Sequence, residues 1–148
     1  MELNRWGTIE TTPVKPHHSR VAMRLAQTLE RALGGEAYTE LAIALPSGLR
    51  VPDVAWCSAQ FLARYAEEFA PGNLALSVPA DLCIEVMSES NTLGELKEKA
   101  AAYVAAGAKE AWIVLPDLGL RFYDASGECP NTSFSVDLSA WRREFTLK

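Results

Sequence analysis

The chain has 148 residues, of which 49% are apolar and 22% charged, and its formal net charge is −5. This length predicts a single domain, residues 1–148, with a core that needs no disulfide or metal to hold it together. The composition excludes a disordered or collagen-like chain. The acidic balance disfavours a protein that coats nucleic acid through charge alone, but it permits an enzyme that holds a metal with carboxylates.

Several features of the chain predict a cytoplasmic protein. The longest stretch without a charge, residues 69–80, is too short to cross a bilayer, and Pro71 interrupts it. The first ten residues lack the basic start and apolar run of a signal peptide. The three cysteines, at positions 57, 83 and 129, are widely spaced, which favours reduced thiols over disulfides or a zinc site.

The hydrophobic pattern, taken in chain order, predicts a mixed β-sheet flanked by helices. The expected elements are a helix over 21–33 with Ser19 as N-cap and Gly34-Gly35 as its stop, a hairpin of 38–45 and 49–56, a helix over 58–69, a loop over 70–79, a strand over 81–87, a helix over 94–106, and strands over 111–115, 120–124 and 133–138. Strand, helix and strand over 81–115 indicate a parallel βαβ unit. The fold class is therefore α/β in one domain.

Two carboxylates lie in apolar strand segments. Asp53 stands in RVPDVAW, where Pro52 favours an edge or strand-end position, and by itself Asp53 is best interpreted as an exposed edge acid. Glu85 stands in DLCIEVM between apolar neighbours, and a carboxylate in a buried strand needs a cation or a metal. A strand with one solvent-facing side is the alternative for Glu85, and the functional interpretation is slightly favoured.

Other polar residues have both a functional and an ordinary interpretation. Lys99 follows Glu95 by four residues, the spacing of a surface ion pair. The polar loop 88–92 follows the Glu85 strand, where ligands of α/β sheets bind, but it can also simply cap the next helix. His17 and His18 are interpreted as surface residues, because the chain has no third histidine to complete a metal site. No phosphate-binding GxxxxGK[ST], GxGxxG or GxSxG motif is present in the sequence.

Three segments together resemble the Uma2 family, also called DUF820: RVPDVAW, PADLCIEVMSES and ELKEKAAAYVAAGAKEAWIVLP. The resemblance covers about residues 17–124. Its most specific part is the E-V/L-x-S-x-S loop followed by a helix with the pattern E-K-x-x-x-Y-x-x-x-G-x-x-x-x-W. The family consists of restriction-endonuclease-like proteins in the PD-(D/E)xK nuclease superfamily, so the resemblance implies a restriction-endonuclease-like core.

The resemblance also implies a catalytic site. Asp53 is the acid of the PD dipeptide and Glu85 the second acid, and both would bind Mg²⁺ or Mn²⁺. The superfamily lysine would fall at Met87, and Lys99 of the following helix takes its place, with Lys97 as the nearby alternative. The additional helix acid of the superfamily is left among Glu30, Glu36 and Glu40.

The activity implied is hydrolysis of phosphodiester bonds in DNA by a metal-dependent endonuclease that acts as a homodimer. Candidate DNA contacts are Ser88, Ser90 and Lys97, and Lys15, Arg20 and Arg24 for backbone phosphates. The alternative is a non-catalytic protein of the nuclease fold that binds nucleic acid or a protein partner. The acidic charge favours this alternative, whereas the presence of Asp53, Glu85 and a lysine favours the enzyme.

Overall fold

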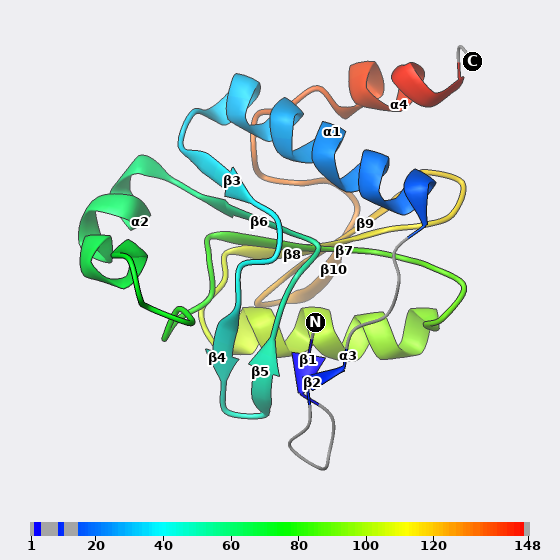
Figure 1. Cartoon of the computed structure of the whole chain (residues 1–148). Helices are drawn as coiled ribbons and strands as arrows, with labels where there is room; N and C mark the ends of the chain where they lie inside the picture. The colour runs from blue at the N-terminus through cyan, green and yellow to red at the C-terminus, as the bar shows by residue number, and fades with distance from the viewer. Residues whose placement is uncertain (1, 4–8, 11–14, 147–148) are drawn as a thin grey trace.

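A computed structural model describes residues 2–3, 9–10 and 15–146 of the chain (Figure 1). Its centre is a six-stranded sheet in the order β10-β9-β8-β7-β6-β3. In that order the strands are Gly127–Cys129, Leu120–Asp124, Glu110–Val114, Leu82–Val86, Val54–Cys57 and Glu36–Tyr38. β7 and β8 run parallel, and the other neighbouring pairs run antiparallel. Two small antiparallel sheets pair β1 (Glu2–Leu3) with β2 (Ile9–Glu10), and β4 (Ile43–Leu45) with β5 (Gly48–Arg50).

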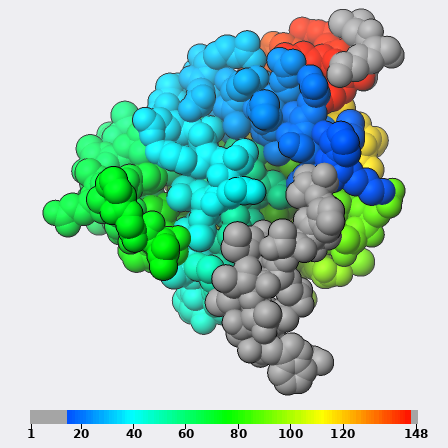
Figure 2. Space-filling view, viewed as in Figure 1, coloured from blue at the N-terminus to red at the C-terminus, as the bar shows by residue number. Residues whose placement is uncertain are grey.

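Helices cover both faces of the central sheet (Figure 1). α1 (Pro16–Leu33) and α4 (Leu138–Thr146) lie on one face, and α3 (Leu93–Ala105) lies on the other. α2 (Ala59–Arg64) and the 3₁₀ turn η1 (Ala66–Phe69) follow β6. Figure 2 shows α1 side by side with the segment that begins at β3. In the part of the chain that the structure describes, no helix combines the length and the apolar character needed to cross a membrane.

The sheet separates two apolar clusters, and β7 contributes to both. Leu82, Ile84 and Val86 pack in the cluster that includes α1, whereas Cys83 packs in the cluster that includes α3. Successive strand residues point to opposite faces, so Glu85 shares the face of Cys83. All five residues of β7 are buried. Glu85 therefore lies in the buried layer between the sheet and α3. The alternative prediction, that one side of this strand faces solvent, is wrong.

The βαβ unit agrees closely with the sequence pattern. β7, α3 and β8 lie within one residue of the predicted 81–87, 94–106 and 111–115, and β9 has the predicted bounds. Thr92 caps α3 by accepting a hydrogen bond from the Glu95 amide at 3.2 Å. The predicted α/β class and mixed sheet are confirmed.

The first helix begins earlier than predicted. α1 starts at Pro16, with Lys15 at the N-cap position, so Ser19 lies inside the helix instead of capping it. Proline is well tolerated in the first turn of a helix, because the amide it lacks would have no helical partner there. The predicted stop is correct: Gly34 has φ +71°, a conformation that favours glycine.

The predicted hairpin and second helix are each divided. Residues 43–50 form the separate β4–β5 hairpin, while β3 and β6 pair in the central sheet. Two residues lie in the connections between the central sheet and this hairpin. Glu40, with φ +60°, lies between β3 and β4, and Pro52 lies between β5 and β6. The predicted helix over 58–69 becomes α2 and η1, with Ser58 as the N-cap of α2.

The predicted strand over 133–138 is wrong. The Glu110 carboxylate, on a residue only 5% exposed, accepts hydrogen bonds from Trp112 Nε1 at 2.8 Å, from Thr132 Oγ1 at 2.7 Å and from both the amide and the hydroxyl of Ser133. These bonds hold the segment against the end of β8, where it forms no strand. α4 then begins at Leu138 and packs against α1.

Candidate active site

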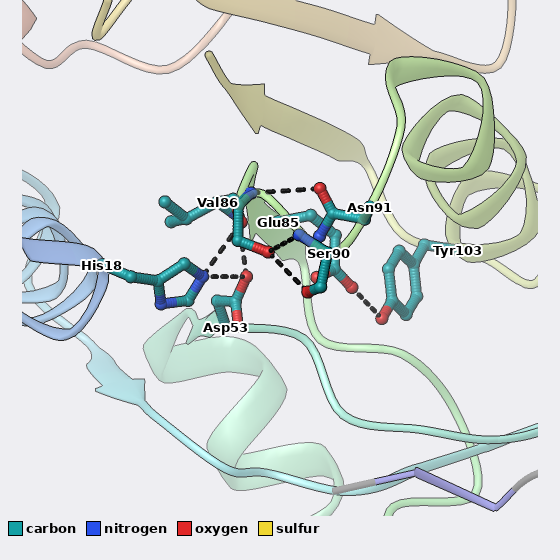
Figure 3. A network of polar contacts seen from close by, with 8 residues as sticks. His18, Asp53, Glu85, Val86, Ser90, Asn91 and Tyr103 are labelled. Carbon is teal, nitrogen blue, oxygen red and sulfur yellow. Dashed lines mark hydrogen bonds and ion pairs between the residues drawn. The ribbon is translucent and has the colours of Figure 1, made fainter. Parts of the chain in front are cut away.

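Asp53 lies immediately before β6, where its carboxylate reaches the neighbouring strand (Figure 3). Its Oδ2 accepts a hydrogen bond from the Val86 amide at 2.7 Å and lies 3.4 Å from His18 Nε2. The side chain is 27% exposed. The predicted strand-end position is correct, but β6 is an inner strand between β3 and β7, so the interpretation as an exposed edge acid is wrong.

Glu85 is the buried acid of the site. The residue is 5% exposed, and its Oε1 accepts a hydrogen bond from the Tyr103 hydroxyl at 2.9 Å. Val54 pairs with Ile84, so continuing this register by one residue sets Asp53 opposite Glu85. Directly opposed residues of antiparallel strands point to the same face. The structure thus brings the two predicted carboxylates to the same end of neighbouring strands.

His18 is a site residue that the sequence interpretation missed. It projects from the first turn of α1 toward Asp53 and Val86 (Figure 3), and its Nε2 donates to the Val86 carbonyl oxygen at 2.9 Å. The hydrogen bond with Asp53 raises the pKa of His18, while burial opposes that rise. The spacing of apolar residues could have identified it. Because α1 starts at Pro16, His18 is three residues before the buried Val21 and seven before the buried Leu25, which places all three on the same face of the helix.

Lys99 and Lys97 lie on different sides of α3. Lys99 is half-buried and stands one helical turn before Tyr103, the residue that donates to Glu85. Lys97 is exposed and is turned about 200° around the helix from Lys99. Glu95, the surface partner suggested by spacing, accepts a hydrogen bond from the Thr92 hydroxyl at 3.2 Å. The helix face therefore favours Lys99 over Lys97 as the lysine of the site.

The polar loop after β7 is organised by hydrogen bonds of its own. Ser88 and Ser90 join their hydroxyls at 2.9 Å, and the Ser88 amide donates to Asn91 Oδ1 at 3.0 Å. Lys15, just before α1, forms an exposed ion pair with Glu89 at 2.6 Å. The loop thus lies beside the carboxylates of Asp53 and Glu85 (Figure 3), and its Glu89 binds Lys15.

The other predicted residues lie farther along α1. Arg20 is exposed and Arg24 is half-buried, and Arg24 Nε is 3.9 Å from the Glu144 carboxylate of α4. Glu30, a candidate for the additional helix acid, accepts a hydrogen bond from the Ala37 amide at 3.0 Å. It is about 18 Å along the helix from His18. The residue of α1 that faces the carboxylates is therefore the histidine.

The donor atoms of the site suit a hard divalent cation. Asp53 and Glu85 supply carboxylate oxygens, and the Val86 carbonyl oxygen lies beside Asp53. Mg²⁺ and Mn²⁺ favour oxygen ligands of this kind. Within the described residues, no group of three or more histidine, cysteine, aspartate or glutamate side chains is already arranged to hold a metal, so any ion held by the two acids would also need main-chain or water oxygens, or a movement of further side chains.

A mixed sheet flanked by helices is an α/β arrangement, and two acids stand at the same end of its adjacent inner strands. The chain belongs to the Uma2 family, whose model, described as "Putative restriction endonuclease", matches residues 1–120. The resemblance seen in the sequence is thereby confirmed.

The fold is also similar to that of a solved protein. The crystal structure is described as "a putative nuclease belonging to DUF820 from Anabaena variabilis ATCC 29413", and it matches with a TM-score of 0.67 at 14% identity. The match covers 97% of this chain and 83% of the other. At that identity the likeness shows the fold, which confirms the predicted restriction-endonuclease-like core. No curated protein matches the chain.

Proposed function

We propose that this protein is a metal-dependent endonuclease that hydrolyses phosphodiester bonds of DNA, with Asp53, Glu85 and Lys99 as its catalytic residues. The observation that carries the proposal is the position of Asp53 and Glu85 at the same end of two neighbouring inner strands, with the half-buried Lys99 one turn from the tyrosine bound to Glu85. Two like charges in one site repel each other, and a bound cation offsets that repulsion.

Asp53 and Glu85 would hold Mg²⁺ or Mn²⁺. Such a cation supplies Lewis-acid chemistry, since it makes water a stronger nucleophile and offsets phosphate charge. Both acids are held in position by hydrogen bonds, because the Val86 amide donates to Asp53 and the Tyr103 hydroxyl donates to Glu85. Fixed hydrogen bonds reduce the rearrangement needed when the ligands are used.

Lys99 would stabilise the negative charge that develops on the phosphate oxygens during attack by water. A long side chain from the turn before Tyr103 can extend toward the end of β7, where Glu85 lies. A donor aimed at developing charge in a partly closed site contributes strongly to catalysis. Lys97, on the exposed side of α3, is better suited to a contact with the DNA backbone.

The DNA would approach across the start of α1 and the loop after β7. Lys15 and Arg20 are exposed there, and Ser88 and Ser90 offer hydroxyl donors. The net charge of −5 gives weak phosphate affinity to a single chain. We propose that the protein acts in the cytoplasm as a homodimer, in which two such surfaces would bind one DNA molecule together.

Cleavage of supercoiled and linear DNA in the presence and absence of Mg²⁺ or Mn²⁺ tests the proposal. We expect cleavage that requires the metal and disappears in Glu85→Gln, which keeps the shape of the side chain. Calorimetric titration with Mn²⁺ should show weaker binding by Asp53→Asn than by the wild type. DNA binding without cleavage under any metal condition would support the non-catalytic alternative instead.

A further inference from the structure

We infer that the groove between α1 and α4 binds a single-stranded segment of the DNA substrate, close to the bond that is cleaved. The inference rests on the proposed function, because it takes DNA as the substrate, and it adds the substrate class: DNA with an unpaired strand. Arg20 and Arg24 would contact phosphates of that strand, and Phe145 would pack against one of its bases.

The two helices that form the groove are positively charged in a chain that is acidic. α1 and α4 lie side by side over one face of the sheet (Figure 1) and together carry five arginines and two glutamates. The whole chain has a net charge of −5, so the residues outside these two helices carry −8. Because phosphates are attracted to positive charge, these helices are a favourable place for nucleic acid to bind.

The groove itself has a volume of about 320 Å³ and is lined by Arg20, Arg24, Glu144 and Phe145. Arg24 follows Arg20 by four residues, so the two guanidinium groups lie on the same side of α1. Arg20 is exposed and forms no ion pair with any described residue. Arg24 is only loosely paired, because its Nε lies 3.9 Å from the Glu144 carboxylate. Both cations can therefore bind phosphates.

Phe145 gives the groove an aromatic wall. Its ring is half-buried and makes edge-to-face contacts with His17, at 6.0 Å between ring centroids, and with Trp141, at 5.7 Å. A basic groove with an aromatic ring is typical of proteins that bind single strands, because unpaired bases expose the faces that stack. In a duplex those faces are covered by the neighbouring base pairs. The groove therefore favours an unpaired strand.

The path from the two acids to the groove also favours a flexible strand. Glu85 shares the face of Cys83, in the layer of α3, whereas α1 and α4 cover the opposite face of the sheet. Arg20 is two residues after His18, which faces Asp53, and is turned about 200° around the helix from it. DNA that contacts both places must turn round the start of α1, a helix about 10 Å wide. Duplex DNA is stiff over about 150 base pairs, so a single strand makes this turn more easily.

The test measures DNA binding by the full-length chain without metal, so that the bound DNA stays intact. Fluorescence anisotropy would compare an unstructured single strand of about 20 nucleotides with the blunt duplex of the same sequence. The groove variants are Phe145→Leu, Glu144→Gln and the double substitution Arg20→Gln/Arg24→Gln. Arg64→Gln is the matched control, because Arg64 is an exposed arginine of α2 outside the groove. Thermal unfolding would verify that each variant is folded.

We expect the wild type and Arg64→Gln to bind the single strand about tenfold or more tighter than the duplex. Phe145→Leu should bind the single strand about fivefold or more weakly, because a stacking ring is lost. The double arginine variant should reduce the slope of log affinity against log salt by about 1.4, since each phosphate contact on a single strand contributes about 0.7. Glu144→Gln should bind more tightly than the wild type, because it removes a negative charge from the groove.

Cleavage in the presence of Mn²⁺ provides a second measurement. A duplex that ends in a single-stranded arm should be cleaved faster than the blunt duplex, and the double arginine variant should lose this preference. Equal affinity for single strand and duplex, or equal losses in Arg64→Gln and the groove variants, would overturn the inference, while metal-dependent cleavage of DNA would leave the proposed function standing. Binding of the single strand that depends on the groove, without cleavage under any metal condition, would support the groove and refute the endonuclease.

Discussion

Replacing Tyr103 with phenylalanine removes one oxygen atom and tests the buried acid directly. Tyr103 is 0% exposed and Glu85 5% exposed, and their hydrogen bond of 2.9 Å satisfies Glu85 Oε1 in a layer closed to water. A hydrogen bond to a charged group contributes about 1.5–3 kcal/mol to stability. At about 2–4 °C for each kcal/mol in a domain of this size, Tyr103→Phe should lower the melting temperature by about 3–12 °C.

The matched control is Tyr38→Phe. The Tyr38 hydroxyl also donates to a carboxylate, but its partner, Glu36, is exposed to solvent. Water can replace that hydrogen bond, so the free energy of unfolding should change by at most about 0.5 kcal/mol. Urea unfolding of both variants, followed by circular dichroism, measures the difference.

A double-mutant cycle with Glu85→Gln assigns the effect to this pair of residues. The loss caused by Tyr103→Phe should shrink when Glu85 is already an amide, because the amide oxygen is a weaker acceptor than a carboxylate. Tyr103→Phe should also weaken Mn²⁺ affinity by about 10- to 100-fold, since it frees a ligand that was fixed. An unchanged stability of Tyr103→Phe, or an equal loss in both backgrounds, would refute the role of this hydrogen bond.

Other substitutions probe the charges of the site and of the fold. Glu85→Gln should leave the metal-free protein as stable as the wild type or more so, because it removes repulsion from Asp53; a large loss in urea unfolding would instead identify Glu85 as a structural ion-pair partner. Lys99→Met should keep the fold but lower the rate of DNA cleavage by about 100-fold or more. Lys97→Met should leave the rate of the catalytic step nearly unchanged in single-turnover assays. The reverse result would assign the catalytic role to Lys97. Burial opposes ionisation of Glu110, but its hydrogen bonds outweigh burial and hold its pKa below the ordinary value. Its contribution to stability is therefore present above the pKa of the unfolded chain and lost as pH falls through the folded pKa, so Glu110→Gln should cost most at neutral pH and least in acid; a pH-independent cost would contradict this.

The sequence by itself determined the elements that depend on local pattern. The strand with Glu85, the helix with Lys99 and the strand after it carry their own hydrophobic periods, and Thr92 supplies the cap of α3. The two acids were also singled out from the sequence, through the motif that resembles the Uma2 family. The family model confirms that the chain belongs to this family. The catalytic roles of the two acids remain a proposal.

Only the tertiary structure decided which residues meet. The pairing of β6 with β7 sets Asp53 opposite Glu85, and no periodicity within either strand specifies that register. The segment 133–138 has the alternation of a strand. The buried Glu110, 23 residues earlier in the chain, accepts the hydrogen bond of the Ser133 amide instead. From the sequence alone His18 is interpreted as a surface residue. The packing of α1 on the sheet places its ring at the end of β7, beside Val86 and Asp53. Such contacts join segments distant in the chain, so they follow from packing and burial and not from local sequence.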